Sequence, residues 1–195
     1  MADSMGFAPD AAVRFRDFPI GCIGAGFIMA DVHLMAYQRA GFPVAAIASR
    51  TQGKAEAVAA RWGIRQVHAT PEDLIADPAV AILDIAYPPD RQPDLIRLAC
   101  AQPHIRGILA QKPLAMDYAA AHATVEACEA AGKLLSVNQN MRFDQSIRVL
   151  KQLLDRSALG TPVLATIEMR AIPHWQPFLA DYDRLTLLNM SIHHL

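Results

Sequence analysis

The sequence predicts an α/β protein with a doubly wound parallel sheet, followed by the beginning of a second, α+β domain. Two observations carry this prediction. Short apolar runs alternate with helix-like runs from residue 18 to about residue 139, which is typical of strands joined by crossover helices. In addition, a glycine pair, Gly24 and Gly26, joins the first apolar run to the first helical run, as in sheets that bind nucleotides.

The individual elements follow from apolar runs and from their start and stop signals. The expected strands are apolar on both faces, as strands covered by helices require, and lie at 18–23, 44–49, 64–68, 81–87, 105–110 and 134–138. The helices between them are expected at 31–40, 53–62, 71–76, 93–102 and 118–131. Gly41, Gly63 and Gly132 end three of these helices, and Thr70 followed by Pro71 begins another.

The pattern changes after residue 140. A helix is expected at 143–159, a strand at 161–172, a loop at 173–183 and a helical run at 185–195. These elements are too few to bury a second core. We therefore expect a flexible arm at 1–17, a dinucleotide-binding domain at 18–140 and the opening of a truncated α+β domain at 141–195.

Composition excludes several classes of protein. With 195 residues, of which 53% are hydrophobic and 19% charged, the chain is globular rather than disordered. Its net charge of -1 predicts no binding of nucleic acid and no attraction to an anionic membrane. No apolar run reaches membrane-spanning length, and the first 16 residues lack a secretory signal. The three cysteines fit no disulfide framework, so we expect reduced thiols and a cytoplasmic protein.

The glycine turn is the first candidate site. In such a turn the backbone of Gly24, Gly26, Phe27 and Ile28 can approach a pyrophosphate, and the following helix offers unpaired N–H groups to it. Met29 stands where a third glycine is usual, and an ordinary tight turn remains the alternative.

Ser49, Arg50 and Thr51 follow the second expected strand, where an NAD site usually has an acidic residue for the ribose hydroxyls. A hydroxyl beside an arginine suits a 2′-phosphate instead, because a guanidinium pairs with phosphate. The sequence thus favours NADP over NAD, although a solvated loop arginine is the competing interpretation.

Two further groups could act in catalysis. Lys112, in Gln111-Lys112-Pro113, follows the fifth expected strand and could hold a substrate hydroxyl, or it could be a surface lysine. Asn189 and His193 are four residues apart and share one face of a helix, where His193 is a candidate general base or a packing residue. The remaining histidines have no ligand-like spacing, so no metal is expected.

Together these motifs make the chain resemble the Gfo/Idh/MocA family of NAD(P)-dependent oxidoreductases, which act mostly on sugars, inositols and related polyols. Residues 24–28 with His33 are similar to the family's GxGxxG-x-x-H opening, with one extra residue before the histidine. Residues 86–89 are similar to its A-T-P-P strand end, 111–113 to its E-K-P motif, 137–143 to its interdomain segment and 189–193 to its D-x-G-x-H helix.

The resemblance implies a Rossmann-type fold and assigns roles residue by residue. Lys112 orients substrate and nicotinamide, His193 takes the hydroxyl proton, and Asn189 positions the substrate. Cofactor contacts are implied for Tyr87, Pro88, Gln111, Lys112 and Asn140. The full-length protein is implied to be a homo-oligomer.

Two functions therefore remain open. One is a sugar or polyol dehydrogenase, and the other is a dinucleotide-binding module without turnover. A methyltransferase-like nucleotide site is a weaker third hypothesis, because Ser49 stands where that site needs an acidic residue.

Overall fold

The computed structural model describes residues 6–168, 170 and 190–193. The chain divides into two compact units. One is Arg14–Asn138, and the other combines Met1–Val13 with Gln139–Leu195. The predicted loop at 173–183 and most of the predicted helical run at 185–195 lie outside the described residues.

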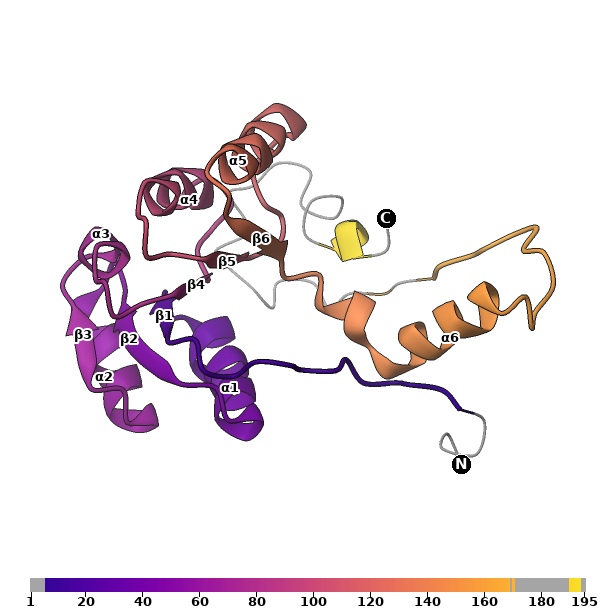
Figure 1. Ribbon diagram of the computed structural model, residues 1–195, viewed down its shortest axis with the longest axis horizontal. Coiled ribbons are helices and arrows are strands. Elements are labelled where there is room, and N and C mark those ends of the chain that lie inside the picture. Colours follow the sequence, from indigo (N-terminus) through magenta and orange to yellow (C-terminus); the bar gives the residue numbers. More distant parts are fainter. Residues whose placement is uncertain (1–5, 169, 171–189, 194–195) are drawn as a thin grey trace. The chain divides into compact units, whose positions relative to one another are not determined.

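The unit Arg14–Asn138 is built on a six-stranded sheet in the order β3-β2-β1-β4-β5-β6 (Figure 1). Every neighbouring pair of strands is parallel. The strands are β1 (Ile20–Ile23), β2 (Val44–Ala48), β3 (Gln66–His68), β4 (Ile82–Ile85), β5 (Gly107–Ala110) and β6 (Leu134–Val137). The predicted doubly wound parallel sheet is confirmed, with each strand slightly shorter than its apolar run.

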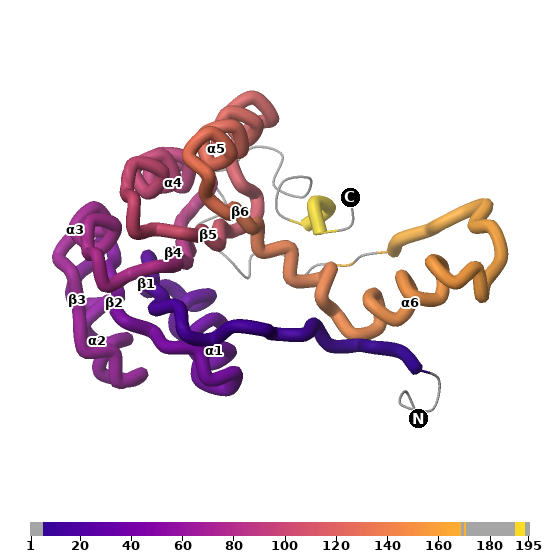
Figure 2. The backbone as a smooth tube through the Cα atoms, in the orientation of Figure 1, coloured from indigo at the N-terminus to yellow at the C-terminus, as the bar shows by residue number. Residues whose placement is uncertain are grey.

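Helices cover both faces of this sheet, and each face has its own apolar core (Figure 2). On one face α1 (Leu34–Ala40) and α2 (Gln52–Trp62) bury Leu34 and Val58 against Ile47 of β2. On the other face lie α3 (Pro71–Ile75), α4 (Gln92–Cys100) and α5 (Tyr118–Ala130), which bury Leu74 and Ile96 among others. Burial on both faces explains why the strands are almost uniformly apolar.

The start and stop signals act as predicted. Gly41 and Gly63 follow α1 and α2 in the left-handed conformation, with φ of 73° and 68°. The Thr70 hydroxyl oxygen accepts a hydrogen bond from the amide of Asp73 at 3.0 Å, which caps α3 ahead of Pro71.

The first helix differs from its prediction at 31–40. It starts earlier, as a π-helical turn over Ile28–His33 that continues into α1, and the amide of Leu34 donates to the carbonyl of Met29 five residues back. A π-helical turn takes up one more residue than an α-helical turn. The turn thus absorbs the extra residue before His33 and leaves that side chain on the buried side of the helix.

The second unit is described by itself. It contains the 3-10 segments η3 (Asn140–Phe143) and η6 (Ser191–His193) and the helix α6 (Gln145–Asp155). The carboxylate of Asp144 accepts from the Ser146 amide at 2.9 Å and so caps α6, which starts later than the predicted residue 143 and ends before residue 159. Residues near the N-terminus belong here too, since the amide of Ala8 donates to Gln152 at 3.0 Å.

The predicted strand at 161–172 is wrong over its described part, because residues 161–168 form no strand. Alternating apolar residues suit a strand only where a neighbouring strand takes up the backbone hydrogen bonds and one face is covered. Among the described residues no strand pairs with this segment, and Val163 is 96% exposed.

None of the helices within the described ranges is both long enough and apolar enough to cross a membrane. The cysteines are free thiols, and the fold brings two of them together, with the Sγ atoms of Cys100 on α4 and Cys128 on α5 3.6 Å apart.

Candidate functional site

The predicted site residues of the sheet unit gather where the strands end. Because all six strands are parallel, their carboxyl ends share one edge of the sheet. Gly24, Arg50, Tyr87 and Gln111 follow β1, β2, β4 and β5 within a few residues, and Asn138, which was not among the predicted site residues, follows β6. Ligands of open α/β sheets bind at this edge, near the point where the strand order reverses between β1 and β4.

The glycine turn has the shape of a phosphate cradle. Gly24 adopts a φ of +117°, and a Cβ there would stand 2.6 Å from the carbonyl oxygen of Ala86, so only glycine fits. A Cβ on Gly26 would meet nothing within 4 Å, which leaves open space above the turn. Among the described residues the exposed amides of Gly26 and Phe27 have no hydrogen-bond partner. Unpaired N–H groups at the start of a helix suit an anion.

The loops after β2 and β4 are linked across the end of β1. The Arg50 amide donates to the Tyr87 hydroxyl oxygen at 2.8 Å, and burial raises the pKa of that hydroxyl. Arg50 and Thr51 are exposed, whereas Ser49 is buried. The three residues predicted to bind a 2′-phosphate, Ser49, Arg50 and Thr51, therefore lie at this edge of the sheet, and the Arg50 side chain is in solvent.

Gln92 fixes the turn that carries Lys112. Its side chain is fully buried, accepts from the Gln111 amide at 2.6 Å, and donates to the carbonyls of Gln111 at 3.1 Å and Pro113 at 3.0 Å. One amide side chain thus satisfies three backbone groups of the turn. Gln92 was not predicted as a site residue, although a polar residue shortly after Pro88 and Pro89 at the end of β4 was a usable signal.

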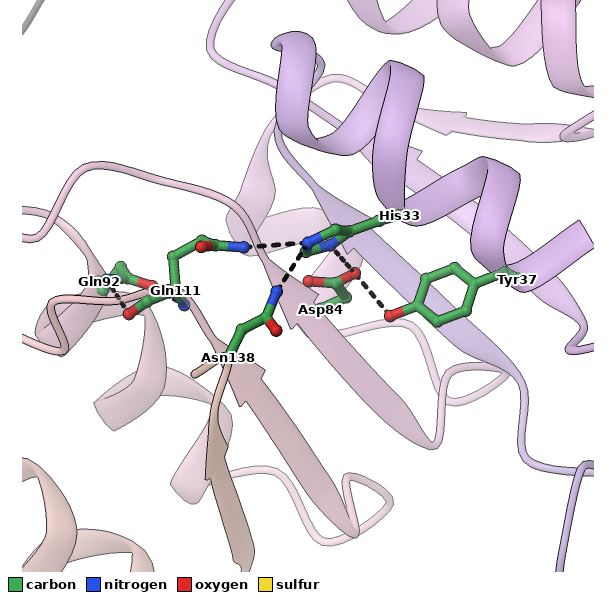
Figure 3. Close-up of polar contacts among 6 residues, drawn as sticks. All are labelled: His33, Tyr37, Asp84, Gln92, Gln111 and Asn138. Atoms are coloured by element: carbon green, nitrogen blue, oxygen red, sulfur yellow. Dashed lines mark hydrogen bonds and ion pairs between the residues drawn. The ribbon is translucent and has the colours of Figure 1, made fainter. Parts of the chain in front are cut away.

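A second polar network centres on His33 (Figure 3). Its Nδ1 lies 2.7 Å from Oδ2 of Asp84, and the Tyr37 hydroxyl donates to the same oxygen at 2.6 Å. Its Nε2 lies 3.0 Å from the side-chain nitrogen of Gln111 and 2.9 Å from that of Asn138. One imidazole therefore connects the first helix with β4 and with the turns that follow β5 and β6.

The network is buried, and its burial changes the pKa values of neighbouring groups. Asp84 is 1% exposed and His33 6%. Burial, and then the Asp84 charge, raises the pKa values of the Tyr37 hydroxyl and the Cys22 thiol. The side chains of the first helix that reach Asp84 are an imidazole and a phenol.

Lys112 follows Gln111 in the sequence and is half-buried. Burial lowers the pKa of its ammonium group. A lysine whose charged form is disfavoured by burial is a candidate for proton chemistry or for holding an anion. The Lys112–Pro113 peptide bond is cis.

The other predicted site residues belong to the second unit. Asn140 is exposed in η3, His193 is partly buried in η6, and Asn189 lies outside the described residues. The catalytic roles predicted for Lys112, His193 and Asn189 stay predictions. In the described part of the chain, no three His, Cys, Asp or Glu side chains are arranged to hold a metal ion.

Residues 18–139 match the family model GFO_IDH_MocA, an oxidoreductase family with an NAD-binding Rossmann fold. The chain belongs to the Gfo/Idh/MocA family. This match covers all six strands of the sheet.

Relatives and solved structures agree with this membership. The chain is 30% identical over 184 residues to a D-apiose dehydrogenase of Paraburkholderia graminis, covering 92% of this chain and 48% of that protein. It is 35% identical over 148 residues to inositol 2-dehydrogenase 1 of Saccharopolyspora erythraea, covering 74% and 43%. An Agrobacterium radiobacter oxidoreductase, solved with NAD+, L-tartaric acid and magnesium, superposes with a TM-score of 0.69 at 29% identity, covering 75% and 42%. The chain thus spans less than half the length of these relatives.

Replacing Gln92 by leucine tests the role of its three hydrogen bonds. Leucine keeps the volume but leaves one amide and two carbonyls of the turn without partners, so Gln92→Leu should lower the free energy of unfolding by about 1–3 kcal/mol. Gln52→Leu on the exposed side of α2 is the matched control and should change it by less than about 0.5 kcal/mol. Urea denaturation measures both. Equal effects of the two substitutions would mean that the Gln92 contacts do not hold the turn.

Proposed function

We propose that the protein is an NAD(P)-dependent dehydrogenase that oxidises a CH–OH group of a sugar, inositol or similar polyol to a carbonyl. The observation that carries the proposal is the phosphate cradle at Gly24 and Gly26 on the same sheet edge as the half-buried Lys112. The names of the relatives, D-apiose and inositol dehydrogenases, support a polyhydroxylated substrate.

The residues at the carboxyl edge of the sheet take the cofactor-binding roles. The backbone of Gly24, Gly26, Phe27 and Ile28 receives the pyrophosphate at the helix start. Tyr87 and Pro88 after β4, Gln111 and Lys112 after β5, and Asn140 line the rest of the cofactor's path. When bound, the nicotinamide supplies the hydride acceptor.

The catalytic roles fall to three side chains. Lys112 holds the reacting hydroxyl and stabilises the charge that develops on its oxygen as the proton leaves. His193 accepts that proton, and Asn189 positions the substrate. A cytoplasmic location and a homo-oligomer belong to the same proposal.

The preferred cofactor is NADP. Ser49, Arg50 and Thr51 offer two hydroxyls and a guanidinium, and no carboxylate at the end of β2 would repel a 2′-phosphate.

Arg50→Ala should weaken NADPH binding selectively. The loss of a charge-assisted contact is worth roughly 1.5–3 kcal/mol, or about a 10- to 150-fold increase in the Kd for NADPH, while the Kd for NADH should change less than about threefold. Titration of nucleotide fluorescence measures both values, and Arg61→Ala, at the far end of α2, is the control. Tighter binding of NADH than of NADPH by the wild type would disprove the preference.

Lys112→Ala should lower kcat for polyol oxidation by about 100-fold or more, the size of effect expected for a group that acts on the reacting proton. The control is Lys54→Ala on α2, which is exposed and should leave kcat unchanged. NADPH formation with myo-inositol and other polyols gives the rates, and nucleotide titration checks that both variants still bind cofactor. A wild-type protein that binds cofactor but oxidises none of these polyols would support the module without turnover instead.

A further inference from the structure

We propose that His33 is a positioning residue that turns the side-chain amides of Gln111 and Asn138, so that both present carbonyl oxygens to the nicotinamide nucleoside of the cofactor. The choice of ligand rests on the proposed function. The orientation of the two amides involves only atoms within Arg14–Asn138 and does not depend on the proposed function.

The first step is the proton on Nδ1 of His33. Oδ2 of Asp84 receives two close contacts, from this nitrogen at 2.7 Å and from the Tyr37 hydroxyl at 2.6 Å. The Tyr37 hydroxyl donates to Oδ2, so this oxygen is an acceptor. An aspartate carboxylate offers acceptors only, and Nδ1 of His33 then carries the hydrogen of the contact between them.

The second step is the opposite side of the ring. The atoms nearest to Nε2 are both amide nitrogens, that of Gln111 at 3.0 Å and that of Asn138 at 2.9 Å. An amide NH2 group donates and has no lone pair to offer, so the single lone pair of Nε2 has to accept, shared between the two donors. The ring is thus neutral and protonated on Nδ1, a form that its carboxylate neighbour selects.

The third step is the direction of the two carbonyl oxygens. In a planar amide the oxygen lies on the other side of the carbon from the nitrogen, so an amide that turns its nitrogen to His33 turns its oxygen away. Figure 3 shows both oxygens directed away from the ring. Within the described residues neither Gln111 Oε1 nor Asn138 Oδ1 has a protein partner, and neither is a buried orphan atom. Both remain accessible to a ligand.

The place of these oxygens indicates the ligand. Gln111 follows β5 and Asn138 follows β6, on the side of the switch point away from Arg50. In a doubly wound sheet the two halves each take one nucleotide of the pair, so a cofactor with its adenosine at Arg50 has its nicotinamide nucleoside over this half. That nucleoside carries donors, namely carboxamide N–H and ribose O–H groups, which match two acceptors.

The carboxylate of Asp84 therefore sets the polarity of a chain of hydrogen bonds that ends at the ligand. With an apolar residue at this position, Nδ1–H would be buried without an acceptor, and the ring would gain by moving its proton to Nε2. At least one amide would then have to turn its oxygen inward, and the ligand would meet an N–H donor instead of an acceptor.

The decisive experiment is 15N NMR of the histidine ring in the uniformly labelled protein. We expect the neutral Nδ1–H form of His33 in the wild type, with couplings across the N–H···N hydrogen bonds to the side chains of Gln111 and Asn138. Asp84→Leu should convert the ring to the Nε2–H form. Tyr37→Phe is the matched control, because it removes the other bond to the same carboxylate and should leave the ring form unchanged. A wild-type ring that is doubly protonated, or protonated on Nε2 alone, would overturn the proposal, whether or not the variants fold.

Cofactor binding tests the part that involves the ligand. Titration with NADPH should give a Kd about tenfold higher for Asp84→Leu than for Tyr37→Phe, the effect of losing one or two hydrogen-bond acceptors. Equal Kd values in folded variants would show that the amide oxygens do not serve the cofactor. Failure of the wild type to bind NADPH would instead reject the proposed function, and the NMR result would still decide the role of His33.

Discussion

The hydrogen bond between His33 and Asp84 is the constraint on which the carboxyl edge depends. At 2.7 Å and almost without exposure to solvent, it fixes the helix that follows the glycine turn to the central strand β4. The other nitrogen of the same ring reaches the turns after β5 and β6. Four chain segments that are remote in sequence are thus held by one side chain, and a shift of any of them strains the rest.

This arrangement is costly for the fold. A carboxylate removed from water loses several kcal/mol of solvation, and only one of the two oxygens of Asp84 is compensated by donors among the described residues. An apolar side chain would fill a strand position between two covered faces at lower cost. Natural sequences break such rules where a site requires it, and the residues tied to Asp84 lie at the edge where the cofactor is proposed to bind.

Gln92 and His33 act on the same turn from opposite sides. Gln92 holds the backbone of Gln111 and Pro113, whereas His33 holds the side chain of Gln111. Lys112 lies between these anchored residues and is therefore limited in where its ammonium group can reach. A lysine side chain has many rotamers, so a fixed backbone on both sides reduces the entropy lost when its ammonium group is held in one place.

Much of the sheet unit could be predicted from the sequence, because its signals are local. Apolar runs place the strands, and Gly41, Gly63 and Thr70 mark helix ends through backbone geometry that depends on one or two residues. The glycine turn and Lys112 could be placed at one edge because parallel strands share their polarity.

The rest depends on contacts that sequence spacing does not reveal. His33 and Asp84 are 51 positions apart, and Gln92 is 19 positions from Gln111, so nothing local indicates that they meet. The strand expected at 161–172 failed for the opposite reason. Its alternation is a local signal, but strand formation also needs a neighbouring strand, and in the described part of the chain none pairs with residues 161–168.

The most direct test of the carboxyl edge as the cofactor site is amide hydrogen exchange with and without saturating NADPH. Exchange should slow at 24–28, 49–51 and 111–112, which follow β1, β2 and β5, and should stay unchanged at 41–42 and 132–133, at the opposite edge of the sheet. Slower exchange at the opposite edge, with no change at the glycine turn or at Lys112, would contradict the assignment of this edge.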